Sequence, residues 1–152
     1  TVIKYWIAAG VVSIVLLMSA LRDSEAVMND TALSDEIARF TDAGPSGATL
    51  RLEQVTDFPW DTVRAFSGTA PLEYYRRYLG ADLDLDDSVS SLITSDSGIL
   101  VFQHKGAVVR TVVLGPPVYL GDGLGLAHER QDAVLMVITK DPGPYVSIEF
   151  VE

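Results

Sequence analysis

The chain of 152 residues contains no cysteine. This absence excludes a disulfide framework, a thiolate metal site, a cysteine nucleophile and lipid attachment through an N-terminal cysteine. Any attachment to a membrane must therefore be made by an apolar segment. The residues that follow such a segment, roughly 110 to 130, are enough to bury the core of one domain.

Acidic residues are missing from the first 22 positions, which carry only Lys4 and Arg22 and a net charge of +2. The remaining residues hold nine Lys and Arg and all 21 Asp and Glu, for a net charge of −12. So negative a domain repels phosphate backbones and anionic lipid headgroups. We therefore expect no nucleic-acid partner. The charge either keeps a membrane-held domain soluble or attracts a basic partner.

The longest run without a charge covers the 17 residues 5–21. As a helix it spans about 25 Å, slightly less than a hydrocarbon core of about 30 Å, and the residues before it can supply the missing turn. Tyr5 and Trp6 suit the headgroup level, where amphipathic rings gather. The pattern predicts a transmembrane anchor over residues 1–22.

A cleaved signal peptide is the alternative interpretation, with Ser24-Glu25-Ala26 as the cleavage site. We favour the anchor because the run is sufficient to cross a bilayer. Lys and Arg near the ends of a span stay on the cytoplasmic side. The expected location is the cell membrane, with a single pass, a short cytoplasmic N-terminus and an extracytoplasmic C-terminal domain.

Residues 23–47 are predicted to form an exposed amphipathic helix followed by a linker. Leu33, Ile37 and Phe40 recur on one helical stripe, and the turn-rich stretch after Phe40 ends the helix. The stripe has two candidate partners, the chain's own domain and a neighbouring protein, and the pattern does not choose between them.

Residues 48–152 are predicted to form an α+β domain with a mainly antiparallel sheet of about six strands and one or two short helices. Strands are expected at 48–55 and 60–66, a short helix between Pro71 and Gly80, and two hairpins at 98–115 and 132–150. The connections between the late strands are too short for crossovers. The runs 99–102 and 133–138 are apolar on both faces, so we expect both sides of the sheet to be covered there, by the chain's own helices or by another protein.

No motif argues for catalysis. The aspartates of segment 82–87 alternate as in a calcium loop, but a calcium loop needs Gly at its sixth and Glu at its twelfth position, which here are Asp87 and Ile93. The two histidines, His104 and His128, lack the elbow motif of a serine hydrolase. The glycines near residue 123 do not match a dinucleotide fingerprint. We therefore expect no enzyme, no cofactor and no metal, and keep a calcium sensor and a small extracytoplasmic hydrolase as alternatives.

Two groups of residues are candidates for contact with other proteins. Within the span, the small residues Ala9, Gly10 and Ser13 permit close helix packing in lipid. In the domain, aromatic and arginine residues of the kind that dominate interface hot spots crowd one segment. The candidate partner contacts there are Trp60, Tyr74, Arg76 and Arg77.

The segments VTDFPWDTVRAF, LGADL and GILVFQHKGAVVRTVVL resemble those of small bacterial membrane-anchored extracytoplasmic domains, which carry a Phe-x-Trp-Asp segment, a tyrosine-containing helix ending in Gly and a hairpin of this pattern. That resemblance implies a tethered domain without known chemistry. By architecture the chain is also similar to accessory subunits of actinobacterial respiratory supercomplexes. This likeness implies a non-catalytic accessory subunit whose partner is an integral membrane complex of the respiratory chain, complexes III and IV.

Overall fold

The computed structural model describes residues 27–80, 83, 85, 87–121, 125–140 and 145–152. Over these residues no helix is long and apolar enough to cross a membrane. The predicted anchor, with Tyr5, Trp6, Ala9, Gly10 and Ser13, lies outside the described residues. The described helices are α2 Thr31–Ala43, α3 Leu52–Val55, α4 Leu72–Leu79 and α5 Asp87–Ser90.

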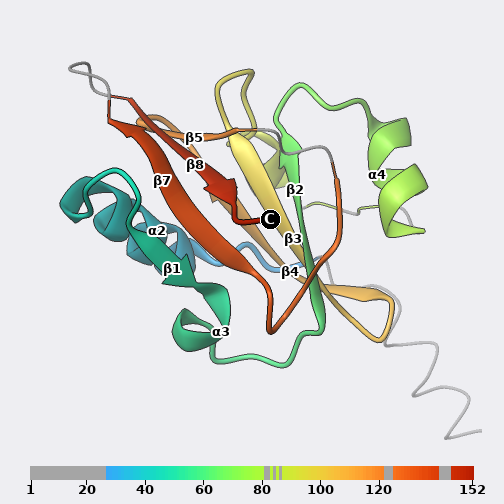
Figure 1. The fold of residues 1–152 in the computed structure, drawn as a ribbon. Helices are drawn as coiled ribbons and strands as arrows, with labels where there is room; N and C mark the ends of the chain where they lie inside the picture. The colour runs from blue at the N-terminus through green and yellow to red at the C-terminus, as the bar shows by residue number, and fades with distance from the viewer. Residues whose placement is uncertain (1–26, 81–82, 84, 86, 122–124, 141–144) are drawn as a thin grey trace, which may run out of the picture.

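Eight strands form two four-stranded sheets, which lie one behind the other in Figure 1. The first sheet has the order β1-β7-β8-β5 and the second β4-β3-β2-β6. All pairs of neighbouring strands are antiparallel except β5 with β8. The strands are β1 Thr49–Arg51, β2 Thr62–Ser67, β3 Gly98–His104, β4 Ala107–Leu114, β5 Val118–Leu120, β6 His128–Glu129, β7 Val134–Lys140 and β8 Val146–Phe150.

The α+β class is confirmed, and the single sheet of about six strands is replaced by two sheets. Two strands were missed because they are only two and three residues long, too short to show a period. The predicted strand 48–55 is wrong in its second half, where α3 forms. Leu52 is buried there, and its carbonyl accepts a hydrogen bond from the Thr56 hydroxyl at 2.9 Å, which closes the helical turn.

The turns follow the sequence signals closely. Gly80 ends α4 with φ of 69°, in the left-handed region that favours glycine. Lys105 and Gly106 join β3 to β4 with φ of 51° and 79°. Positive φ at both central residues matches the right-handed twist of the paired strands. The predicted short helix and both predicted hairpins are confirmed.

The main core lies between the two sheets and is completed by α2. Inward-facing residues of both sheets, such as Phe102 and Leu135, are fully buried in it. Leu33 and Ile37 of α2 belong to the same core, and Phe40 packs against it. The amphipathic stripe therefore packs on the chain's own domain, and α2 is not an exposed helix.

A second, smaller core lies on the outer face of the β4-β3-β2-β6 sheet, under α4 and α5. Ile99 and Val101 of β3 pack there with Tyr75 and Leu79 of α4. The prediction of coverage on both faces is thus confirmed for residues 99–102. The chain itself supplies both covers.

Candidate functional site

The outer face of β7 carries two apolar side chains, which lie between polar residues of the neighbouring strands and are only partly covered by the described chain. Side chains alternate along a strand, and Leu135 and Val137 point into the main core. Val134 and Met136 point the other way, are half-buried, and pack against neither core. The expected coverage of both faces at 133–138 is therefore complete on the core side and only partial on the other side. In Figure 1 this face of β7 and β8 is turned toward the viewer, with α2 and the second sheet behind it.

Two tyrosines extend this face toward the edge strand β5. Tyr119 of β5 pairs in register with Ser147 of β8. Two residues further along β8, Glu149 pairs with Met136 of β7, so the three strands share this face. The Tyr119 ring packs edge-on against Tyr145, with the ring centroids 5.2 Å apart. Tyr145 is 49% exposed. We call the set Val134, Met136, Tyr119 and Tyr145 the outer sheet face.

The aromatic and arginine segment chosen from the sequence divides between core and surface. Trp60 is 3% exposed, lies edge-on to Phe102 at 5.0 Å, and donates its indole N–H to the Thr56 hydroxyl. Trp60 is therefore a core residue with little surface left for a partner. Tyr74 is 39% exposed, and Arg76 and Arg77 are exposed on the same helix, α4.

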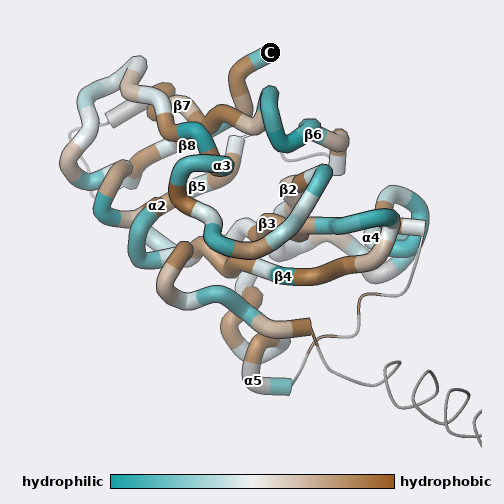
Figure 2. The backbone as a smooth tube through the Cα atoms, turned by 90° about the horizontal axis from the view of Figure 1, so that it is seen from below, coloured by the Kyte–Doolittle hydropathy of each residue, from teal (hydrophilic) through white to brown (hydrophobic). Residues whose placement is uncertain are grey.

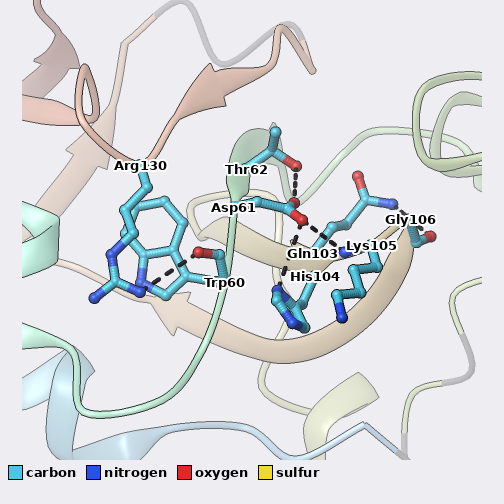
Figure 3. A network of polar contacts seen from close by, with 8 residues as sticks. All are labelled: Trp60, Asp61, Thr62, Gln103, His104, Lys105, Gly106 and Arg130. Carbon is cyan, nitrogen blue, oxygen red and sulfur yellow. Dashed lines mark hydrogen bonds and ion pairs between the residues drawn. The ribbon is translucent and has the colours of Figure 1, made fainter.

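A network around Asp61 holds the β3–β4 turn in place (Figure 3). One oxygen of its carboxylate accepts a hydrogen bond from the Lys105 backbone N–H at 2.6 Å. The same oxygen lies 3.6 Å from Nδ1 of His104. The Asp61 backbone N–H donates to the Gln103 carbonyl, and its carbonyl accepts from the Arg130 N–H, both at 2.9 Å. These contacts give the carboxylate a structural use in fixing the turn.

An open groove of about 420 Å³ runs beside this network. Arg130 lies over the Trp60 ring in it, with its guanidinium carbon 5.4 Å from the ring centre. A serine hydrolase would need a serine beside His104 and Asp61, and the hydroxyl in the groove lining is that of Thr62. The lining consists of Trp60, Asp61, Thr62, Glu129, Arg130 and Gln131.

A second groove, of about 510 Å³, lies between α2 and α3. Two of the three acidic residues in its lining make contacts within the chain. Asp30 caps α2 by accepting a hydrogen bond from the Leu33 N–H at 2.9 Å, and Glu36 pairs with Arg39 at 2.6 Å. Over the described residues no group of three or more His, Asp and Glu side chains is placed to hold a metal ion. The aspartates at 82, 84 and 86 lie outside the described residues.

The second histidine belongs to a different environment. His128 on β6 stacks on the Phe150 ring, with the centroids 3.9 Å apart. Burial, and then the nearby Arg64, lower the pKa of His128 from 6.5. Burial also lowers the pKa of Arg64, whose guanidinium donates to the Gly125 carbonyl at 2.5 Å. Arg64 is not among the site residues predicted from the sequence, although a charged residue in the middle of an apolar strand is a signal that marks it.

Gln103 joins three segments under α4. Its side-chain amide donates to the carbonyls of Leu79 at 3.1 Å and Gly106 at 3.2 Å, and its oxygen accepts from Arg64 at 3.4 Å. The side chain is buried and fully engaged, so it ties the end of α4 to the β3–β4 turn. Like the network around Asp61, this contact serves the fold.

No protein-family model, curated protein or solved structure matches the chain.

Proposed function

We propose that the protein is a non-catalytic, single-pass accessory subunit that packs on a larger membrane complex. In this proposal residues 1–22 span the membrane and the acidic domain docks on an exposed subunit. The specific complex we propose is an actinobacterial respiratory supercomplex of complexes III and IV, by likeness of architecture. The cell membrane is the proposed location, with the domain on the extracytoplasmic side.

The observation that carries the docking part is the outer sheet face. A strand buried on both sides reads as a continuous apolar run, and β7 has such a run, yet Val134 and Met136 are only half-buried and pack against neither core of the described chain. Methionine and tyrosine are enriched in protein interfaces, because they bury much area and adapt to a partner's shape. The surface composition thus fits a protein partner.

The test begins with purification of the full chain in mild detergent through a C-terminal tag, followed by mass spectrometry of the proteins recovered with it. Stoichiometric recovery of a membrane complex supports an accessory subunit and names the partner. Recovery of respiratory complexes III and IV supports the specific assignment. Recovery of the chain alone contradicts the proposal.

Three variants locate the contacts. Met136→Lys places a charge on the outer sheet face and should lower recovery of the partner at least about tenfold, since an unpaired buried charge is costly. Gln54→Lys makes the same change of charge at an exposed position on α3 and should leave recovery unchanged. Gly10→Leu tests packing of the span. The thermal midpoint of each variant must stay within a few degrees of the parent, so that loss of fold is not mistaken for loss of docking.

A further inference from the structure

The segment between the apolar run and α2 is hydrogen-bonded to the edge strand β4. The Asp30 N–H donates to the Thr111 carbonyl at 2.8 Å, and the Thr111 N–H donates to the Met28 carbonyl at 3.0 Å. The side-chain oxygen of Asn29 accepts from the Val113 N–H at 3.1 Å. Residues 28–30 therefore lie along the edge of β4, where Asn29 forms a parallel bridge with Thr111, and Val27 forms a second parallel bridge with Leu85.

This pairing has a direction. Asn29 lies opposite Thr111, and in a parallel pair the residues before Asn29 lie beside earlier residues of β4. Going back along the chain from Asn29 therefore leads toward Ala107, where β4 begins, and not toward Leu114, where it ends. We call the Ala107 end of the sandwich the tether end. Figure 2 shows the first described residues at the lower right, beside β4 and α5.

Tyr145 lies at the opposite end. Tyr145 packs on Tyr119 of β5. The next residue of β5, Leu120, lies against Gly98, so close that a Cβ on Gly98 would overlap the Leu120 side chain. Gly98 pairs with Leu114, the last residue of β4. The eight residues of β4 extend over about 24 Å, which separates the two ends.

The tether is short compared with this separation. If the span ends at Arg22, five Cα steps lead to Val27, with a reach of about 17 Å when fully extended. Residues 28–30 are held by their hydrogen bonds to β4 and Val27 by its bridge to Leu85. These contacts leave only the four residues 23–26 of the tether unconstrained. A domain of this size has a diameter of about 35 Å.

We infer that the domain is held in one orientation, with its tether end against the bilayer surface and the Tyr119–Tyr145 end away from it. The inference rests on the proposed membrane anchor. The orientation is set by the short tether and the β4 pairing and not by affinity for lipid, because the acidic domain gains nothing from anionic headgroups. Met28, which is 62% exposed, lies beside Arg110 in the middle of β4 and therefore farther from the bilayer than Ala107 in this orientation.

The chain is suited to a labelling test because it has no cysteine of its own. Ala107→Cys places a thiol at the tether end, Met28→Cys places one beside the middle of β4, and Tyr145→Cys places one at the far end. All three positions are exposed, so each should react with a thiol-specific fluorophore. The labelled full-length chains are reconstituted into phosphatidylcholine vesicles that contain a lipid with a nitroxide on its headgroup.

Quenching at positions 28 and 107 should exceed that at 145 at least about twofold. A control with ten Gly-Ser residues inserted after Arg22 should lose most of this difference, because the longer tether frees the domain to turn. Equal or reversed quenching in the chain without the insert overturns the inferred orientation.

Flotation and alkaline extraction of the same vesicles test the membrane anchor separately from the orientation of the domain. A chain that stays with the lipid but shows no gradient contradicts the orientation alone. A chain released from the lipid contradicts the anchor and therefore both proposals.

Discussion

Ile37 of α2 is fully buried in the main core between the two sheets. Replacing Ile37 with Ala removes three carbon groups, a loss of about 2.4 kcal/mol at about 0.8 kcal/mol each. The cavity left behind adds to this, so we expect a loss of about 2–5 kcal/mol in the free energy of unfolding. For a domain of this size, a loss of 3 kcal/mol lowers the thermal midpoint by about 10 °C.

The assay is thermal unfolding of the full chain in detergent, followed by near-ultraviolet circular dichroism. Asp35→Ala on the exposed side of the same helix is the control, and its midpoint should change by no more than about 2 °C. An Ile37→Ala midpoint as close to the parent as that of the control would refute the packing of α2 on the two sheets. It would also remove the ground for a short, fixed tether.

Three further predictions concern individual positions. Gly98→Ala should destabilise the domain by about 1–3 kcal/mol, because a Cβ at this position overlaps Leu120 of β5. Gly115→Ala is the control and should not destabilise it, because a Cβ at Gly115 meets no atom within 4 Å. Chemical denaturation compares the two variants. Asp30→Ala should cost about 1 kcal/mol in the same assay by removing the N-cap of α2. The pKa of His128 is lowered by burial and Arg64, so its contribution to stability is complete above pH 6.5 and declines as the pH falls below that value. His128→Gln should therefore flatten the fall of the thermal midpoint between pH 7.5 and pH 5; an unchanged slope would assign it to other groups.

The elements with strong local signals were predictable from the sequence. Pro71 and Gly80 bracket α4, and Lys105-Gly106 joins two apolar runs, because each position meets a local backbone requirement that few residues satisfy. A left-handed C-cap or a two-residue turn depends on its own φ angles and not on distant contacts. These elements were therefore predicted with the right type and nearly the right bounds.

The division into two sheets was not predictable in the same way. β5 pairs in parallel with β8 across an intervening stretch of 25 residues, and β6 has only two residues. Such pairings depend on how distant segments fold onto each other, so no local period announces them. At Leu52, burial favoured a helical turn over the alternation that the sequence showed.

The candidate site shows the same limit at the level of single side chains. Trp60 and Tyr74 look alike as interface candidates in the sequence, because both combine a large ring with a polar atom. Only the fold shows that the Trp60 indole is used inside the domain, by Thr56 and Phe102. Conversely, Val134 and Met136 read as ordinary core residues of an apolar run, and only the alternation of β7 shows that they point away from both cores.

The pairing of residues 28–30 with β4 was not predicted from the sequence, and it bears on where the outer sheet face lies. An edge strand with free backbone groups is a site for unwanted pairing with other chains, and proteins usually cover it. Here the segment that leads to the predicted anchor covers the β4 edge. The Met28 carbonyl and the Asn29 side-chain oxygen accept hydrogen bonds from β4, and the Asp30 N–H donates one to it. This cover both protects the edge and fixes the point from which the tether leaves. In the proposed membrane arrangement the tether leads toward the Ala107 end of β4, so the outer sheet face would lie along the side of the domain, where we propose that a neighbouring subunit docks.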